Sequence, residues 1–587
     1  GHAELRGAAM ILQALVRYYE DLLQNDTLHA PGWVQEKISW GLQLADDGQP
    51  LVLHDLRTPQ QRGKKTVLLP REEFVPERVK RSSGVAANFL CDNSSYILGA
   101  DAKGKPERTA QCFAACRALH QDILQDTPGS AAAAVRAFFA AWQPASAAEN
   151  PVLQPHWDEL MQGGNIIFLT SDGTFILDDA DIRAAWQRRC SAQDDAPPVR
   201  CLVTGQQAPL ARLHPSVKGV AGAQSSGAAI VSFNADAFCS YGHEQGGNAP
   251  VGSYAASAYT QALNYLLADR EHRQTLGDTT VVCWAQGGQP AYQEACLEML
   301  FSHGGLTETE LLGLLDRLAH GKPADWHGIT LDPGTHFYLL GLAPNAARLS
   351  VRFFRQDTFG ALAENVQRHH DDLRIVRPAN EKFETIPLYF LLQETVNKKD
   401  QNPAPAPQLS GDVLRAVADG TPYPATLLNT VMLRIRAERE ITRGRAAILK
   451  AYYLRRPHPL CPKEVLTVEL NQDCNALPYL LGRLFSVLEQ IQQEALGSEL
   501  NTTIKDRYFN SAMTHPAYVY PTLIKLAEKH LAKLSSGRQV YFSKQLTQLV
   551  GRLNSSFPTQ LTLPEQGAFI IGYYHQTQQR YTKKTEE

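Results

Sequence analysis

The residues best suited to contact a polymer lie in one segment, 201–267, which is rich in Gly, Ser, Asn, Gln and Ala. A loop within it, 218–227, reads KGVAGAQSSG. Small residues let a backbone approach a ligand closely. A lysine suits a phosphate or a base acceptor, and amides and hydroxyls can bond to base edges. This loop is therefore predicted to bind a polymer, with a structural Gly-rich turn as the alternative. The candidate contact residues are Lys218, Gln224, Ser225 and Ser226 in the loop and Asn234, which follows it.

A second segment with cations and hydroxyls begins at residue 78 and reads RVKRSSG over its first seven residues. Three cations, two hydroxyls and a glycine can clasp phosphates or enter a groove. The alternative is a solvated basic loop, so this segment is the second choice. Its candidate residues are Arg78, Lys80, Arg81 and Asn93.

Residues 434–456 are dense in cations. On helices such a run predicts a basic stripe, in which each neutralised phosphate adds salt-dependent affinity without sequence preference. A solvated face is the alternative. The predicted contacts to a nucleic-acid backbone are Arg434, Arg436, Arg439, Arg443 and Arg445, followed in the same run by Lys450, Arg455 and Arg456.

The residue types that carry covalent or metal chemistry do not form complete sets. Cys201 and His214 would need two further zinc ligands at ligand spacing, and none is found. Cys112 and Cys116 share one helix face, which favours a core position. The paired serines of the loop lack a GxSxG elbow, and residues 63–66 lack the first glycine of a phosphate-binding loop. We therefore expect no catalytic residue, no bound metal and no cofactor.

One cluster keeps a rival hypothesis open. His369, His370, Asp371 and Asp372 resemble the imidazole and carboxylate clusters of metal-dependent nucleases. The run lies in a polar stretch and lacks further ordered carboxylates. A solvated loop or helix face is the favoured interpretation, with a nuclease as the alternative.

Composition describes an ordinary globular protein of 587 residues, 44% hydrophobic and 20% charged, for which two to four domains are expected. The formal net charge of −3 is uneven. Residues 411–587 carry 22 Lys and Arg against 15 Asp and Glu, about +7, which leaves about −10 for the rest. A basic C-terminal region predicts a polyanion or an acidic protein as partner. The ten cysteines include no CxxC pair, which favours free thiols in a reducing cytoplasm. No apolar run reaches the length of a membrane span.

Apolar periodicity predicts an α+β fold: a large mixed N-terminal body followed by an all-α helical bundle. Residues 1–9 look like a cloning remnant before a natural start at Met10. The body, 10–396, mixes helices with predicted strands such as 279–284. Residues 397–411 contain alternating prolines and predict a linker. The helices expected within 412–587 are 412–418, 424–440, 443–455, 476–494, 503–510, 517–533 and 540–553.

Four long segments together resemble one protein family. They are ILQALVRYYEDLL (11–23), KRSSGVAANFLCDNSSYILG (80–99), the CLVTG…LHPSVKGVAGAQSSGAAIVSFN segment (201–234), and YLLGRLFSVLEQIQ…TTIKDRYFNSAMTHPAYVYPTLIKL (479–526). The family is the large subunit of the type I-C CRISPR Cascade surveillance complex, and the resemblance covers nearly the whole chain from Met10.

The resemblance implies a non-enzymatic role, because base pairing with a guide RNA reads the target in such complexes. The large subunit would recognise a short protospacer-adjacent motif in double-stranded DNA, help open the duplex and stabilise the R-loop, and help recruit the helicase-nuclease. The region from 412 resembles the family's small subunit. The implied partners are the guide RNA-bound backbone, 5′-handle-binding and small subunits, target DNA, the helicase-nuclease and phage anti-CRISPR proteins. No membrane is expected among the partners. A purely structural bridge that contacts no DNA is a further alternative.

Overall fold

The structure is a computed structural model. It describes residues 2–25, 27–28, 30, 32–62, 65–79, 84–192, 198–233, 235–269, 272–302, 304–497, 502–553 and 556–581. The chain divides into two compact units. Unit 1 comprises residues 1–214 and 233–259, and unit 2 comprises residues 215–232 and 260–587.

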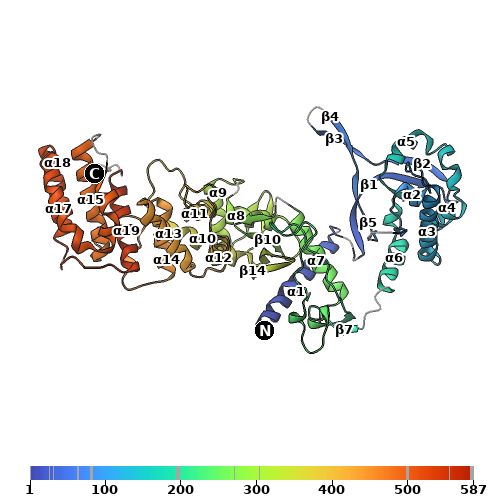
Figure 1. Ribbon diagram of the computed structural model, residues 1–587, viewed down its shortest axis with the longest axis horizontal. Coiled ribbons are helices and arrows are strands. Elements are labelled where there is room, and N and C mark those ends of the chain that lie inside the picture. Colours follow the sequence, from blue (N-terminus) through green and yellow to red (C-terminus); the bar gives the residue numbers. More distant parts are fainter. Residues whose placement is uncertain are drawn as a thin grey trace. The chain divides into compact units, whose positions relative to one another are not determined.

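Unit 1 is built around the long strand β1 (Trp33–Leu44). Antiparallel β2 (Pro50–Asp55) and β5 (Arg71–Pro76) pair with it, and β6 (Asn165–Leu169) pairs with it in parallel. Strands β3 (Thr58–Arg62) and β4 (Lys65–Leu69) form a separate hairpin (Figure 1). A second two-stranded ribbon pairs β7 (Pro198–Arg200) with β8 (Gln207–Pro209).

The helices of unit 1 cover an aromatic core that includes Trp40, Phe138, Phe139 and Phe168. Trp40 lies on β1 and is fully buried, and β1 is the central strand because it pairs with β2, β5 and β6. The helices with residues in this unit are α1 (His2–Gln24), α2 (Ser94–Ile97), α3 (Pro106–Leu124), α4 (Ser130–Ala141), α5 (Trp157–Gln162), α6 (Ala180–Ala192) and, up to residue 259, α7 (Ser253–Ala268).

Unit 2 begins with an antiparallel sheet in the order β14-β13-β10-β9. All seven residues of β10, TTVVCWA, are buried, as predicted for a strand with a mainly apolar sequence. The strands are β9 (Gln274–Leu276), β10 (Thr279–Ala285), β13 (His336–Asn345) and β14 (Arg348–Thr358), with a separate ribbon of β11 (Ala324–Trp326) and β12 (Ile329–Leu331).

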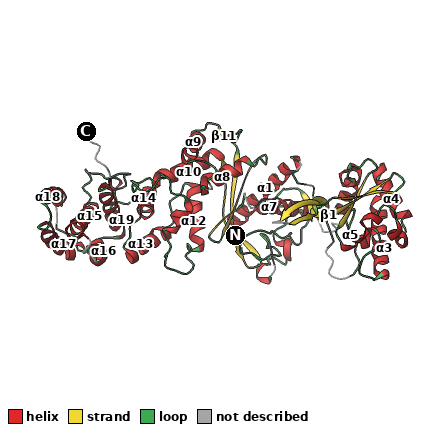
Figure 2. Cartoon of the chain, turned by 90° about the horizontal axis from the view of Figure 1, so that it is seen from above, coloured by secondary structure: helices red, strands yellow, loops and turns green. Residues whose placement is uncertain are grey.

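Helices make up the rest of unit 2, and the part after residue 406 contains helices without named strands among its described residues (Figure 2). The α+β fold class with an all-helical C-terminal region is therefore confirmed. The helices are α8 (Ala291–Phe301), α9 (Glu308–Ala319), α10 (Phe359–Leu373), α11 (Leu388–Gln393), α12 (Pro407–Asp419), α13 (Ala425–Glu438), α14 (Arg443–Arg455), α15 (Leu477–Leu496), α16 (Ile504–Thr514), α17 (Pro516–Leu531), α18 (Ser536–Val550) and α19 (Leu563–Gln579).

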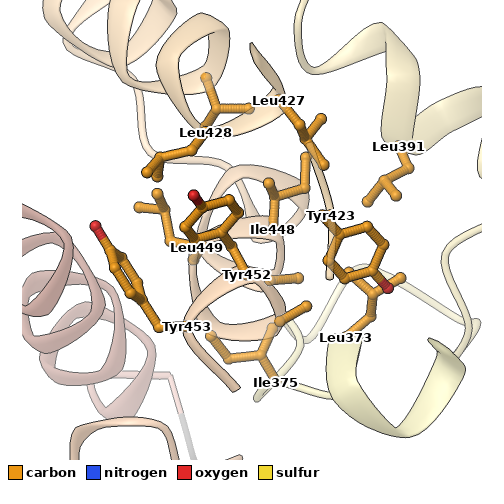
Figure 3. Close-up of a cluster of buried hydrophobic side chains, with 14 of the residues drawn as sticks. Leu373, Ile375, Leu391, Tyr423, Leu427, Leu428, Ile448, Leu449, Tyr452 and Tyr453 are labelled. Carbon is orange, nitrogen blue, oxygen red and sulfur yellow. The ribbon is translucent and has the colours of Figure 1, made fainter. Parts of the chain in front are cut away.

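One hydrophobic core runs from the sheet of unit 2 into these helices. One buried cluster contains Leu391 of α11, Ile448 of α14 and Tyr423, which lies between α12 and α13 (Figure 3). The predicted linker, 397–411, lies inside this unit, and its last five residues open helix α12. Leu409, counted there as linker, is 4% exposed. A proline at the first position of a helix is favourable, which is why Pro407 starts α12 rather than extending the linker.

Candidate nucleic-acid interface

The candidate loop is closed at its base by a small backbone bridge. Val217 and Ala228 exchange two N–H to carbonyl hydrogen bonds of 2.9 Å each. The side chains of Val217, Val220 and Ala228 are 1%, 5% and 2% exposed, so they anchor the loop in unit 2. Residues 218–227 thus form a loop whose two ends, Val217 and Ala228, are buried and hydrogen-bonded to each other.

Two side chains outside the loop fix the path of its backbone. Asn264 of α7 accepts the Lys218 N–H at 2.8 Å through Oδ1 and donates to the carbonyl of Ser216 at 3.2 Å through Nδ2. Arg273 donates to the carbonyl oxygen of Gly219 at 2.7 Å. The amide and the guanidinium therefore satisfy three backbone groups that would otherwise need water.

The loop is also attached to the sheet of unit 2. The Ala221 N–H donates to Thr280 Oγ1 on β10 at 3.0 Å. Just past the loop, the Ala229 N–H donates to the Ala347 carbonyl at 3.1 Å, and the Leu349 N–H donates to the Ala229 carbonyl at 2.9 Å. These bonds tie the loop to the turn between β13 and β14.

Two glycines are required by this path. Gly219 has φ +92°, and a Cβ there would lie 3.0 Å from the carbonyl oxygen of Leu267. Gly227 has φ +97°, and its Cβ would lie 2.7 Å from Ser216 Cβ. Both positions combine a left-handed backbone with close packing, which only glycine accommodates readily.

The loop presents the predicted contact residues together. Lys218, Gln224, Ser225 and Ser226 are all exposed. Within the described part of the chain, their side-chain donors and acceptors have no internal partner. Asn234, the fifth predicted residue, lies outside the described residues. A fixed backbone that carries unpaired amide, hydroxyl and ammonium groups is able to hydrogen-bond to an external ligand.

The second-choice segment is only partly described. Arg78 pairs with Glu36 at 3.2 Å, both side chains being less than one-third exposed. Asn93 is the N-cap of α2, where its side chain accepts the Ser95 N–H at 3.1 Å. Lys80 and Arg81 lie outside the described residues. The two described candidates therefore already have structural partners within unit 1.

The first half of the predicted basic stripe lies on α13 and its C-cap. Arg434 pairs with Glu438 at 3.5 Å, and Arg436 donates to the Gln566 side chain at 2.6 Å. Arg439 caps the helix with φ +55° and is exposed. These three cations reach the surface to different degrees, and Arg439 is the most open.

Four cations of the second half of the stripe, Arg443, Arg445, Lys450 and Arg455, are buried, which corrects the sequence prediction, whereas Arg456 is exposed. The first of the four is Arg443. Its side chain is 6% exposed and pairs with Glu381 at 2.9 Å. The same guanidinium donates to the carbonyl of Phe383 at 2.8 Å and to that of Glu384. A guanidinium buried in three internal bonds is not available to phosphates.

Arg445 is corrected for the same reason. Its side chain is 1% exposed, and it pairs with Glu394 at 3.4 Å and with Glu438. It also donates to the carbonyl of Glu440 at 2.9 Å. Burial of a charge is costly unless it is paired and hydrogen-bonded, and these contacts meet that requirement inside the protein.

The cluster at 369–372 also differs from the prediction of a solvated face. His369 and His370 are 3% and 8% exposed on the last turns of α10. His369 Nδ1 bonds to the Tyr423 hydroxyl at 2.6 Å. Burial lowers the pKa of His370 to about 4 and that of His369 well below its ordinary value. Both imidazoles are therefore neutral core residues.

Two further cations of the stripe contact the neighbouring residue, Asp372. Arg455 Nε pairs with Asp372 at 2.7 Å, and Lys450 Nζ donates to the Asp372 carbonyl oxygen at 2.9 Å. Both cations are buried, and burial lowers the pKa of Lys450 to about 8. Among the described residues, no group of three or more His, Cys, Asp and Glu is arranged to hold a metal ion.

The cysteine candidates are buried, and the histidine candidate, His214, is partly buried. Cys201 is 1% exposed, and His214 Nδ1 bonds to the Tyr259 hydroxyl at 2.7 Å. Burial lowers the pKa of His214 to about 4. Cys112 and Cys116 are both buried in the hydrophobic core of unit 1. Their positions account for these residues through packing.

Sequence reasoning missed the residues that hold the candidate loop, namely Asn264, Arg273 and Thr280. Each lies more than 40 residues from the loop position that it bonds to. No local pattern marks them, because their role depends on partners that only the fold brings near.

The described helices include none long and apolar enough to cross a membrane.

Comparison with known proteins gives the family. No curated protein matches the sequence. The profile of a family described as CRISPR-associated protein (Cas_Csd1) matches residues 15–581. The chain therefore belongs to the Cas_Csd1 family of CRISPR-associated proteins, the family of the type I-C Cascade large subunit.

Proposed function

We propose that this Cascade component is a non-catalytic DNA-binding subunit that recognises the short motif adjacent to the target in double-stranded DNA. The observation that carries the proposal is the loop 218–227, closed by the Val217–Ala228 bridge, with Lys218 and Gln224 exposed. In RNA-guided complexes base pairing reads the target, which leaves the adjacent motif to protein side chains.

The chemistry of the loop suits a groove. Gln224 offers a donor and an acceptor to a base edge, the two serines can do either, and Lys218 suits a phosphate or a base acceptor. The backbone is already held by Asn264, Arg273 and Thr280. Little conformational entropy is therefore lost when the loop binds, which favours affinity.

The cations of α13 supply a second, sequence-independent contact. Arg434, Arg436 and Arg439 would approach the phosphates of the duplex or of the displaced strand, help hold the duplex open and stabilise the R-loop. Arg443 and Arg445 have no part in this contact because they are buried.

The proposed partners follow from membership of Cascade. They are the guide RNA-bound backbone, 5′-handle-binding and small subunits, target double-stranded DNA and the recruited helicase-nuclease, all in the cytoplasm. Phage anti-CRISPR proteins are expected to act on the same complex. Of these roles, motif recognition is the one that the loop supports most directly.

Photocrosslinking tests the proposal. The assembled complex is bound to duplex DNA that carries a photoreactive thymidine beside the motif, and the crosslinked peptides are identified by mass spectrometry. We expect crosslinks to the peptide that spans 218–227. Crosslinks confined to other subunits would leave this chain as a structural bridge.

A further inference from the structure

A cavity of about 520 Å³ lies in unit 2, where the chain leaves helix α14. Sites that bind small molecules ordinarily have volumes of about 300–1,000 Å³, so this cavity is large enough to hold one. We call it the 457–466 cavity, after the segment that forms most of its wall. Neither the loop 218–227 nor the cations of α13 contribute to it.

The wall of the cavity is an ordered turn. Beyond the end of α14, Pro457 and Pro459 each have a backbone φ fixed by the proline ring. The Cys461 N–H donates to the His458 carbonyl oxygen at 3.0 Å, which closes the turn. A short 3₁₀ helix, Lys463–Val465, follows it. The cavity is therefore formed before a ligand arrives, which lowers the entropy cost of binding.

Most of the cavity lining is apolar. Leu454 is partly buried, and Cys461 and Leu466 are 1% and 7% exposed. Burial raises the pKa of the Cys461 thiol to about 12, so this side chain is neutral and adds to the apolar surface. An apolar lining favours a hydrocarbon body in the ligand and disfavours a phosphate, whose charges would lose their water.

One polar group of the lining lacks a partner. Tyr453 lines the cavity and is 3% exposed. Its buried hydroxyl forms no hydrogen bond within the described part of the chain, and it points away from the neighbouring buried side chains (Figure 3). Burial raises the pKa of Tyr453, so the hydroxyl keeps its proton. A buried O–H donor without an acceptor costs free energy, and an acceptor on a ligand removes that cost.

The polar groups at the rim of the cavity are also donors. His458 and Lys463 are exposed. His458 Nδ1 accepts the Leu460 N–H at 3.2 Å, which leaves Nε2 as the N–H of the neutral ring. Lys463 forms no ion pair among the residues that the structure describes. None of the described lining residues is Asp or Glu, and the adjacent Glu464 is exposed. Charge at the cavity therefore favours an anionic group in the ligand.

We infer that the 457–466 cavity binds a small apolar monocarboxylate. The hydrocarbon body packs on Leu454, Cys461 and Leu466, and the carboxylate accepts a hydrogen bond from the hydroxyl of Tyr453. Lys463 supplies the opposite charge at the rim. A single carboxylate matches the single buried donor, whereas a wholly apolar ligand leaves that donor unpaired. This site is separate from the loop 218–227 and does not depend on the proposed function.

Isothermal titration calorimetry of the full-length chain tests the site with two probes that share one hydrocarbon body, naphthylacetate and the neutral naphthylethanol. The wild type should bind the acid with a Kd of about 1 mM or lower, as expected for a ligand of this size. It should bind the alcohol roughly tenfold more weakly, because a charged acceptor forms the stronger hydrogen bond. Tyr453→Phe removes only the hydroxyl and should weaken binding of the acid about fivefold or more. Tyr452→Phe, the same change at the adjacent tyrosine outside the described lining, is the matched control and should bind as the wild type does.

Thermal unfolding without a ligand gives a second measurement. Because the Tyr453 hydroxyl has no internal partner among the described residues, Tyr453→Phe should keep the wild-type Tm or raise it. A lowered Tm would show that the hydroxyl is paired inside the protein and would overturn the inference. Three calorimetric results would overturn it as well: no binding of the acid by the wild type, equal affinities for acid and alcohol, or wild-type affinity for the acid in Tyr453→Phe.

Discussion

Arg443 donates a hydrogen bond of 2.8 Å from its guanidinium to the backbone carbonyl oxygen of Phe383, sixty residues earlier in the chain. The same side chain neutralises Glu381. Arg443, which the sequence predicts to be a surface charge, is thus a buried residue that holds two parts of the chain together. It fixes residues 381–384 through two backbone carbonyls and one carboxylate.

Replacing this clamp should destabilise the protein. Arg443→Ala leaves two backbone carbonyls and the Glu381 carboxylate without their partner, and we expect a loss of about 2–3 kcal/mol in the free energy of unfolding. Urea denaturation followed by tryptophan fluorescence measures it. The dependence of duplex affinity on salt should keep its wild-type slope, because Arg443 is not exposed. Unchanged stability together with a smaller slope would instead make Arg443 a direct phosphate contact.

Arg439 should behave in the opposite way. It is exposed at the end of α13 and forms no ion pair among the described residues. Arg439→Gln should leave stability nearly unchanged and lower the slope of log affinity against log salt by about 0.9, the value for one lost phosphate contact. Titrations of duplex DNA, with and without the motif, at several salt concentrations give this slope. An unaltered slope would show that the cation faces solvent or another protein.

The contact between α15 and α19 predicts a large effect from one methyl group. A Cβ at Gly482 would lie 1.9 Å from the carbonyl oxygen of Phe569 on the facing helix. Gly482→Ala should therefore cost roughly 1–3 kcal/mol or more through overpacking, despite alanine's higher helix propensity. Gly537→Ala in α18 is the matched control, because no atom lies within 4 Å of its Cβ position. It should be neutral or stabilise by up to about 1 kcal/mol. Equal stability of the two variants would refute the close helix contact.

His120 predicts a loss of stability in acid. Its Nε2 accepts the Leu90 N–H at 2.9 Å and its Nδ1 donates to the Cys116 carbonyl at 2.7 Å, so protonation of Nε2 would remove the bond to Leu90. Burial lowers the pKa of His120 from 6.5 to about 4. Between pH 6.5 and about pH 4 this imidazole is protonated in the unfolded chain and neutral in the folded chain. The free energy of unfolding therefore falls as the pH falls.

From pH 7 to pH 5 this single group should remove about 2 kcal/mol. His120→Gln should abolish that part of the pH dependence in urea denaturation. His320→Gln, at an imidazole that is 63% exposed, is the control and should retain it. The same pH dependence in the wild type and in His120→Gln would contradict the assignment.

Local patterns were sufficient for much of the fold. The apolar run of β10 predicted a buried strand, and the 3.6-residue periodicity over 476–494 predicted α15. The candidate loop was also visible, because its glycines and polar residues are neighbours in sequence.

Long-range pairing was not visible. Arg445 reads as one more cation of a stripe, yet Glu394 lies 51 residues before it. His369 and His370 stand among polar residues, and only the packing of α10 against α9, α12 and α14 explains why they are buried. Charge density in a sequence therefore predicts a basic surface only where no distant carboxylate folds back onto the cations.

The central claim is that loop 218–227 reads the motif, and the ratio of affinities for duplexes with and without the motif tests it most directly. Lys218→Ala with Gln224→Ala in the assembled complex should lower affinity for the motif-bearing duplex roughly tenfold or more and bring the ratio toward one, while assembly is retained. Lys544→Ala with Gln548→Ala, an exposed Lys and Gln pair on α18, is the matched control and should keep the wild-type ratio. A wild-type ratio in the loop variant would contradict the claim.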